Sequence, residues 1–520
     1  RTRHARLLLP SLAGTRPHGG LMEAPVAEPG ASVVSEPDVL DTTAAGGRIL
    51  RGSFLRFGGY VATTGLSVIS AALLTRHLGV ARFGQYVTVL SLVGVVSAIT
   101  DAGMSTIGTR EFAISSGPER TELMSDLLGL RMLLTAGGVL IVVAFSLAVG
   151  YDTALLLGAV LASLGTVALV VQHTYTIPIS AALRLGTLSV LDLARQVLNV
   201  GFIVALVVGG AGVLPLLAVV LAVNLLLIPP TASLARNEIS LRMRFRPSQW
   251  LALVRLTVSF SLAAAVGTLY IFTAQILTSL VASAHQSGLF AASFRIFIVV
   301  GAIPGLLVGG ALPLLARAAR DDRERLAYAL GRIFDVSLVV GVAAALATLG
   351  GASFMLEVVA GPKYAAATDV LRIQGLALIA SFVLAGWSYA LLSLNRYRGV
   401  LLANLAAFLV SFVLTIVLAG VDGAKGAALA TVCGEATLAI GSLLALVRGH
   451  RDLLPRRTVV LKVLVCAAAG VPLALFAPLP SVARAVLAVA VFGAGALLTG
   501  AVPQEVLDLI QRRPRRPRPG

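Results

Sequence analysis

Long apolar stretches recur along the chain from about residue 53 to residue 503, and short polar connections separate them. Most are close to the roughly 20 apolar residues that a membrane-spanning helix needs. The thirteenth stretch contains Pro472 and precedes Pro478, so the last two are the weakest and twelve spans is the alternative count. The pattern predicts fourteen spans, at 53–76, 84–109, 127–150, 153–176, 184–208, 212–234, 251–275, 288–316, 330–350, 368–393, 398–419, 426–447, 461–477 and 482–502.

The composition agrees with an all-α integral membrane protein. Of 520 residues, 57% are hydrophobic and 12% charged, and the mean hydropathy is +0.93, far from the usual mix of a soluble domain. Cys433 and Cys466 both lie in apolar runs, so we expect no disulfide framework, metal site or cofactor. The net charge of +17 comes from arginines in connections between spans, which indicates membrane orientation rather than nucleic-acid binding.

Basic residues are concentrated in alternate connections, sixteen in one set against four in the other. The larger set comprises Arg110, Arg120, Arg236, Arg242, Arg244, Arg246, Arg317, Arg320, Arg323, Arg325, Arg396, Arg398, Arg448, Arg451, Arg456 and Arg457. The smaller set is Arg76, Arg82, Lys363 and Lys425. The positive-inside rule places the larger set in the cytoplasm. Abundant arginine and alanine point to a GC-rich bacterium, so we expect a multi-pass protein of the bacterial cytoplasmic membrane with both termini cytoplasmic.

The two ends of the chain have the composition of tails. Residues 1–47 are rich in Pro, Gly, Ser and Ala without periodicity, which predicts a disordered cytoplasmic tail. The apolar core and cleavage site of a signal peptide are missing from it, and the first methionine is Met22, so residues 1–21 can be an artefact of start-site choice. Residues 504–520 are expected to form a basic cytoplasmic tail.

A weak internal repeat suggests two similar bundles. "LLTRHLGVARFGQY" at 73–86 resembles "ILTSLVASAHQSGLF" at 276–290, each with a glycine two residues before an aromatic. A second pair, at 198–213 and 407–427, has a similar offset. Transporters are commonly built from such repeats. The predicted organisation is an N-lobe at 48–235 (spans 1–6), a basic linker at 236–250, a C-lobe at 251–450 (spans 7–12) and a terminal helix pair at 451–503 (spans 13–14).

An enzyme is not expected, and no catalytic residue is assigned. The largest outer connection, at about 351–367, is too short for a catalytic domain, and there are no paired acids or nucleophile constellation. His285 by itself does not make a metal site.

Three stretches resemble the polysaccharide flippases (Wzx-type, O-antigen and teichuronic acid translocases) of the multidrug/oligosaccharidyl-lipid/polysaccharide exporter superfamily. They are "LGVARFGQYVTVLSLVGVVSAITDAGMSTIGTRE" at 78–111, "SGLFAASFRI" at 287–296 and "GPKYAAATDVLRIQG" at 361–375. With the span count, the resemblance covers 48 to about 450. It implies two six-helix lobes that form a V-shaped cavity and alternate between inward and outward openings.

The same resemblance implies a cargo and partners. The protein would carry an undecaprenyl-diphosphate-linked oligosaccharide from the inner to the outer leaflet for cell-surface polysaccharide biosynthesis. It would meet membrane lipids and, in the same pathway, glycosyltransferases and a polymerase. The alternatives are a peptidoglycan lipid-precursor flippase and a cation-coupled multidrug exporter of the same superfamily.

Arginines within spans are the candidates for binding a diphosphate, because an unpaired phosphate is costly to bury and a guanidinium stays charged. Arg56 lies one turn into the first span, and Arg295 about seven residues into the eighth, roughly 10 Å deep. Arg195, near mid-membrane, has Asp192 three residues earlier, so a local ion pair competes with a cavity role. The other span arginines have simpler expectations: Arg131, Arg255 and Arg332 snorkel to the cytoplasmic edge, and Arg372 pairs with Asp369.

Two acids within spans are the gate or coupling-ion candidates. Asp101 ends about fifteen uncharged residues, and it is expected to form an interhelical salt bridge with Arg56 or Arg110, to mark a helix-breaking turn, or to act in a gate. Glu435 is near the middle of the twelfth span with no base within four positions. It is a candidate to bind a proton or a sodium ion that couples transport to an ion gradient or the membrane potential, unless another helix supplies its partner. Five further polar residues line the cavity or join helices: Asn199, Asn224, Gln275, Gln374 and Asn404.

Overall fold

The computed structural model describes residues 43–101, 103–235, 246–309, 315, 318, 323–448, 453 and 457–503, and these contain helices and no strand. The α-helices are α1 (Thr43–Asp101), α2 (Met104–Ile114), α3 (Pro118–Ala148), α4 (Thr153–Ala181), α5 (Leu185–Val208), α6 (Val213–Ala235), α7 (Pro247–Val281), α8 (Ala284–Gly301), α9 (Ile303–Gly309), α11 (Arg323–Val359), α12 (Thr368–Ser393), α13 (Tyr397–Val447), α14 (Arg457–Phe476) and α15 (Ser481–Leu498). A 3₁₀ segment, η2 (Pro362–Ala367), precedes α12.

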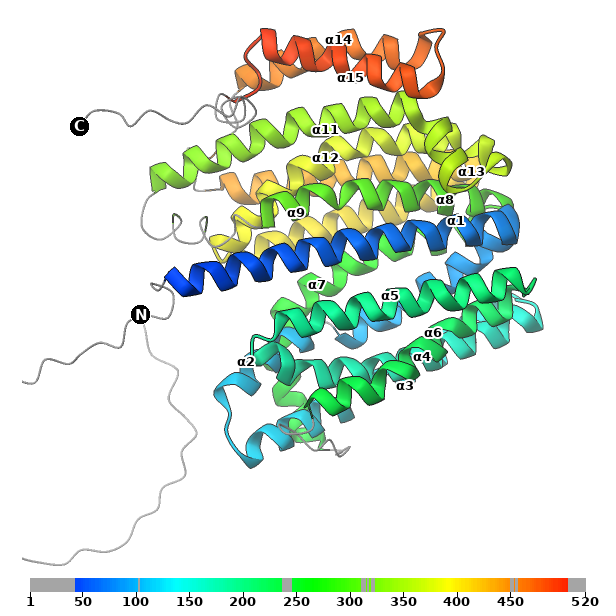
Figure 1. The fold of residues 1–520 in the computed structure, drawn as a ribbon, viewed down its shortest axis with the longest axis vertical. Coiled ribbons are helices and arrows are strands. Elements are labelled where there is room, and N and C mark those ends of the chain that lie inside the picture. The colour runs from blue at the N-terminus through cyan, green and yellow to red at the C-terminus, as the bar shows by residue number, and fades with distance from the viewer. Residues whose placement is uncertain are drawn as a thin grey trace, which may run out of the picture. The chain divides into compact units, whose positions relative to one another are not determined.

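The predicted all-α membrane fold is confirmed (Figure 1). Among the described residues, eleven helices are long and apolar enough to cross a membrane. Two of them have two arms, because α1 leaves helical geometry at Gly79 and α13 does so at Asp422 and Gly423. With α7, whose residues 265–281 form a shorter apolar helix, they account for the fourteen expected spans. Helices suit this environment because lipid offers no partner to backbone N–H and C=O groups.

The helices pack in two groups along the chain. Helices α2 to α6 contact one another, most closely α4 with α6, and α7 to α13 contact one another, most closely α11 with α12 and α12 with α13. Glycines allow the close α4–α6 packing: a Cβ on Gly165 would lie 2.7 Å from the backbone nitrogen of Leu221. Helices α14 and α15 pack on each other and on α11, and α14 continues through Pro472 to Phe476.

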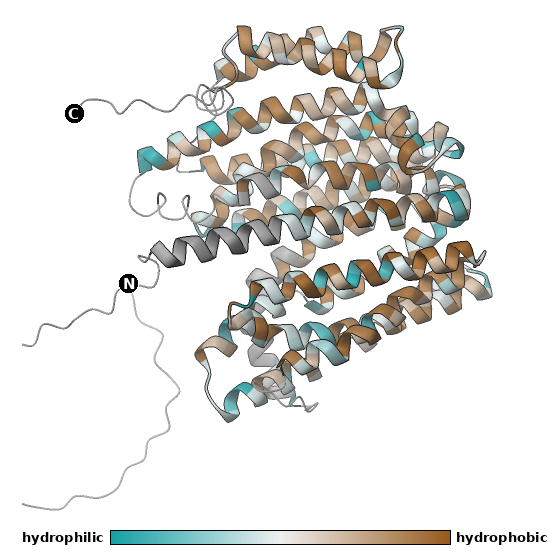
Figure 2. Ribbon diagram, viewed as in Figure 1, coloured by the Kyte–Doolittle hydropathy of each residue, from teal (hydrophilic) through white to brown (hydrophobic). Residues whose placement is uncertain are grey.

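Hydropathy changes along the length of the helices (Figure 2). Apolar residues dominate the helical stretches, and many hydrophilic residues lie near the ends and in the connections. We call the end that carries Arg110, Arg184, Arg396 and Arg398 the basic end. The opposite end, where turns contain Gly79, Gly150, Gly210 and Gly423, is called the glycine end. Large apolar side chains such as Leu140 and Leu461 are exposed along the outside, as a lipid-facing surface requires.

The two similar stretches of the repeat meet at the glycine end. A Cβ on Gly84 would lie 2.6 Å from the backbone nitrogen of Gly288, and a Cβ on Gly288 would lie 1.9 Å from the carbonyl oxygen of Val80. Beside this crossing, Thr75 Oγ1 donates to Val359 O at 3.1 Å and Arg76 donates to Val358 O at 2.9 Å. The second arm of α1 is thereby in contact with the start of α8, and the first arm with the end of α11.

Several expectations lie outside the described residues: the tails at 1–42 and 504–520, the linker at 236–245, and the side chains of Arg56 and Arg255. Helix α1 begins at Thr43, within the stretch expected to be a tail.

Candidate functional site

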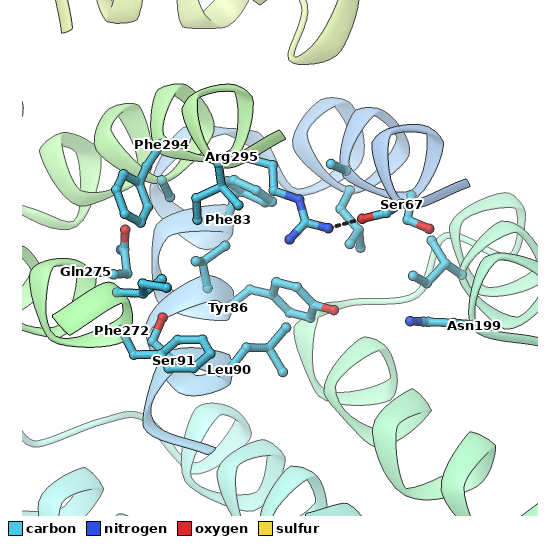
Figure 3. A pocket seen from close by; sticks show the side chains of 18 of the residues that line it. Ser67, Phe83, Tyr86, Leu90, Ser91, Asn199, Phe272, Gln275, Phe294 and Arg295 are labelled. Carbon is cyan, nitrogen blue, oxygen red and sulfur yellow. Dashed lines mark hydrogen bonds between the residues drawn. The ribbon is translucent and has the colours of Figure 1, made fainter. Parts of the chain in front are cut away.

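A cavity of about 300 Å³ lies between both arms of α1, α5, α7 and α8 (Figure 3). These elements come from both halves of the sequence, and the hairpin of α1 supplies two of the walls. Apolar residues such as Leu74 and Phe294 form much of the lining. Its polar groups are Ser67, Ser70, Tyr86, Ser91, Gln196, Asn199, Gln275 and Arg295. The lining therefore combines hydroxyls and amides with a single basic side chain.

Arg295 is the cation of this cavity. Its guanidinium donates to the hydroxyl of Ser67 on the first arm of α1 (Figure 3), and it forms no ion pair with any residue that the structure describes. The side chain is accessible to solvent from the cavity although protein surrounds it on most sides. A positive charge held this way, without a carboxylate, is available to an anionic ligand.

A second hollow, of about 340 Å³, adjoins the first. Asp101, His173, Thr268 and Ser97 are among its lining residues. Phe272 lines both spaces, so its ring belongs to the wall between them. That ring lies against Gly94, where a Cβ would come within 2.6 Å of it.

Asp101 ends the second arm of α1 and is paired with Arg131 of α3. Arg131 Nη2 lies 2.7 Å from Asp101 Oδ1 and 2.8 Å from Ser105 Oγ, and Nη1 lies 3.3 Å from Thr174 Oγ1. The chain turns directly after it, with Gly103 in the left-handed region at φ 77°. A salt bridge and a helix break are thus both present at Asp101. The described partner is Arg131 rather than Arg110, and the Arg56 side chain lies outside the described residues.

The expectation that Arg131 snorkels to the cytoplasmic edge is wrong. Its side chain is 1% exposed, because Asp101, Ser105 and Thr174 supply oxygen acceptors inside the bundle. Arg332 lies 3.8 Å from Asp335. Arg372 pairs with Asp369 at 3.3 Å as expected.

Arg195 of α5 is directed to α4 rather than to the cavity lining. Its guanidinium donates to Gln172 Oε1, and Nη1 lies 3.4 Å from His173 Nε2. Gln172 in turn donates to Thr231 Oγ1 at 3.1 Å. The neighbouring Gln196 and Asn199 of α5 do line the cavity.

Glu435, in the second arm of α13, receives its hydrogen bonds from other helices. Tyr270 of α7 donates its hydroxyl to Oε1 at 3.1 Å, and Ser381 of α12 donates to Oε2 at 2.7 Å. The residue is 8% exposed, and no basic side chain is among these partners. The carboxyl thus lies among hydroxyls, a set of oxygens that suits a proton or a hard cation.

Sequence reasoning missed several of these residues. Ser67, Tyr86 and Gln196 line the cavity, and His173 lines the second hollow. Of the expected polar residues, Asn199 and Gln275 line the cavity, whereas Asn224 donates to the carbonyl of Gly165 at 3.1 Å. Serines and tyrosines are common in apolar helices, so only the spacing of Tyr86 after Gly84 gave any signal. Among the described residues, no group of three or more His, Cys, Asp or Glu could hold a metal ion.

Comparison with known proteins gives no sequence match, since no family model and no curated protein matches the chain. Solved structures match over most of its length. "Lipid II flippase MurJ, inward closed conformation" has a TM-score of 0.71 at 11% identity, over 88% of this chain and 100% of that chain. The chain has the fold of that flippase. An inward-facing multidrug resistance MATE family transporter of the MOP superfamily has a TM-score of 0.56 at 12% identity, over 77% of this chain and 98% of that one.

An outward-facing structure of a MATE family transporter of the same superfamily matches with a TM-score of 0.51 at 13% identity, over 78% of this chain and 95% of that chain. The neighbours are transporters and a flippase rather than enzymes. They share the fold of this chain, and its eleven described apolar helices agree with a multi-pass membrane protein. At these identities they show the fold alone, and they do not single out the Wzx-type flippases.

Proposed function

We propose that this protein is a flippase that moves a polyprenyl-diphosphate-linked oligosaccharide from the inner to the outer leaflet of a bacterial cytoplasmic membrane by alternating access. The basic end is cytoplasmic in this proposal. Glycosyltransferases would supply the cargo on that side, and a polymerase would use it on the other.

The observation that carries the proposal is Arg295, a cation without a carboxylate in a cavity between the two halves of the chain. A diphosphate needs a positive charge to leave water for the membrane interior, and the guanidinium fork matches phosphate oxygens. The hydroxyls and amides around it, including Asn199 and Gln196, are groups that bind sugar hydroxyls. The polyprenyl chain needs no protein site because lipid surrounds the bundle.

A peptidoglycan lipid-precursor flippase is the second candidate, favoured by the fold similarity to a lipid II flippase. Its cargo has the same diphosphate chemistry and a different headgroup, so Arg295 serves either. A multidrug exporter, the third candidate, is supported by the MATE neighbours. Arg295 weighs against cationic drugs as the cargo, because a like charge in the cavity repels them.

The test is reconstitution in proteoliposomes with a fluorescent polyprenyl-diphosphate N-acetylglucosamine, scored by its loss from the leaflet accessible to a quencher. Wild type is expected to flip the lipid, Arg295→Ala to lose at least roughly tenfold in rate, and Arg295→Lys to retain part of it. Arg372→Ala is the matched control, because Arg372 pairs with Asp369 outside the cavity. A wild type that flips no diphosphate lipid, or an Arg295→Ala rate equal to wild type, contradicts the proposal.

Rescue experiments then separate the two cargoes. Expression in bacteria that lack a polysaccharide flippase, and in bacteria depleted of their lipid II flippase, is compared at equal membrane levels. Restored surface glycan in the first strain supports the polysaccharide cargo. Restored growth in the second strain supports the peptidoglycan precursor instead.

A further inference from the structure

A separate hollow of about 1050 Å³ lies at the basic end, between α7 and the two arms of α13. Small residues bring the arms together there: a Cβ on Gly399 would lie 2.8 Å from Ala445 Cβ, and one on Gly441 would lie 3.1 Å from Ala403 Cβ. These residues also line the hollow, so their missing side-chain volume leaves space beside the crossing. We call this space the α13 hollow.

Part of the wall of the α13 hollow is formed by exposed leucines. Leu402 and Leu444, one on each arm of α13, are 60% and 57% exposed, and Leu262 of α7 is 49% exposed. Side chains this exposed leave an apolar surface on which an acyl chain can pack. The hollow is therefore an open recess with an apolar wall rather than a part of the packed core.

Two unpaired cations lie at the rim of this recess. Arg398 and Arg448 both line it and are exposed, and neither forms an ion pair with a residue that the structure describes. Arg396 already has hydrogen-bond partners, because its Nη1 donates to the carbonyls of Ala445 and Arg448 at 2.8 Å each. The lining contains no acid, so nothing within the recess neutralises the two guanidinium groups.

We propose that the α13 hollow binds one anionic phospholipid of the leaflet at the basic end, with its phosphate on Arg398 and Arg448 and an acyl chain along Leu402, Leu444 and Leu262. The occupant is a bilayer lipid because the recess combines exposed leucines with two exposed arginines, which match the acyl chains and the phosphate of a phospholipid. Basic pockets between membrane helices bind such headgroups, and arginine binds phosphate with two parallel hydrogen bonds. The site is distinct from the Arg295 cavity, which shares no lining residue with it.

Native mass spectrometry of the full chain tests the proposal, with phosphatidylglycerol as probe and phosphatidylcholine of the same acyl chains as the uncharged counterpart. One tightly retained phosphatidylglycerol is expected on wild type. The double variant Arg398→Gln, Arg448→Gln is expected to retain it roughly tenfold less. The control, Arg110→Gln with Arg184→Gln, removes the same charge at the same end from two exposed arginines outside the hollow and is expected to match wild type.

A steric variant separates the site from general charge. Ala406 is exposed and lines the hollow, so Ala406→Trp fills the space, leaves the arginines in place, and is expected to lower retention as the double arginine variant does. Equal loss in the control pair, equal retention of the two phospholipids, or full retention by Ala406→Trp each overturns the proposal. So does displacement of the phosphatidylglycerol by one equivalent of undecaprenyl diphosphate, which would assign the hollow to the cargo lipid.

Discussion

Arg131 and Arg295 are both intramembrane arginines, but their surroundings give them opposite properties. The Arg131 side chain is 1% exposed and has three oxygen partners. Its charge therefore holds α3 to the end of α1. Arg295 has one described partner, a hydroxyl, and borders a cavity. A guanidinium stabilises structure in the first setting, and in the second it is available to a ligand.

The Asp101–Arg131 pair predicts an unequal response to removing either partner. Asp101→Asn leaves a buried cation without its acid and should lower the free energy of unfolding by about 3–5 kcal/mol. Arg131→Met should cost less, because the Asp101 side chain is 43% exposed and can be hydrated from its hollow. The double variant should regain part of the loss. Unfolding in detergent by denaturant titration measures all three, and equal losses in the two single variants would contradict the ordering.

Glu435 is the candidate residue for binding a coupling proton or sodium ion, and transport measurements can test this role. In proteoliposomes, imposed proton and sodium gradients should each be tried as the driving force, and wild-type transport should respond to one of them. Glu435→Gln keeps the size and the oxygen that Tyr270 reaches but cannot carry the charge change, so its transport should no longer respond to that gradient. Ser381→Ala is the control, because it removes one hydrogen bond and keeps the carboxyl. A full response in Glu435→Gln would return this residue to a structural role.

At the scale of the helix, the start of α4 has a polar cap. Asp152 Oδ1 accepts from the backbone nitrogen of Leu155 at 2.9 Å, and Oδ2 lies 3.1 Å from Arg82 Nη1. The backbone hydrogen bond, followed by Arg82, lowers the pKa of the Asp152 carboxyl. The pKa of an aspartate in an unfolded chain is about 3.9. Because folding lowers the pKa of Asp152, its carboxylate stabilises the fold at pH values above that pKa. The stabilisation is lost as the pH falls through the lower pKa of the folded state.

Two substitutions separate the cap from the charge. Asp152→Ala removes the cap and should cost about 1 kcal/mol near neutral pH. Asp152→Asn keeps a capping oxygen and removes only the charge. Its stability should therefore differ from that of the wild-type protein near pH 7, and the two should converge as the pH falls below about 4. Thermal unfolding in detergent across this pH range measures both, and a constant difference between the Asp152→Asn variant and the wild-type protein would show that the charge contributes nothing.

The helices themselves were predictable because length and hydropathy alone decide whether a segment crosses a bilayer. The residues at which the helices begin and end were harder to predict. Gly103 breaks the second span at Asp101, and α3 starts at Pro118, well before the apolar stretch that marks it. Polar residues can extend a helix beyond the membrane without changing its apolar part. For that reason hydropathy predicted the positions of the spans better than the ends of the helices.

At the scale of the molecule, the Gly84–Gly288 crossing joins the two halves at the glycine end. In the proposed alternating access, this contact would have to separate when the cavity opens to that side. Gly84→Ala places a methyl group 2.6 Å from backbone of Gly288, where no side-chain movement relieves it, and should favour the state open at the glycine end. Gly65→Ala is the control on the same helix, because a Cβ there meets nothing within 4 Å.

Labelling reports the shift. In a Cys433→Ala background, Asn199→Cys places a thiol in the cavity. An impermeant maleimide added at the glycine end should label it several-fold faster with Gly84→Ala than with Gly65→Ala. Equal rates would mean that the crossing does not control access.

The site was only partly predictable, since depth along a helix does not tell which way a side chain points. Arg295 was expected at a useful depth and lies in the cavity. Arg195 was expected near mid-membrane and is directed to Gln172 on α4. The difference is set by the rotation of each helix about its axis, which depends on packing against neighbours. Ser67 and Gln196 face the cavity for the same reason, and no local signal marks them.

The wall between the two hollows has a consequence for timing. It includes one ring, Phe272, resting on Gly94. Rotation of a side chain is faster by orders of magnitude than the movement of whole groups of helices, which takes microseconds to milliseconds. A passage opened between the Asp101 hollow and the Arg295 cavity by this ring would therefore need no movement of a helix. In the proposed transport cycle, water would then reach Arg295 on a shorter timescale than the cargo crosses, and the slower movement of the helices would set the turnover rate.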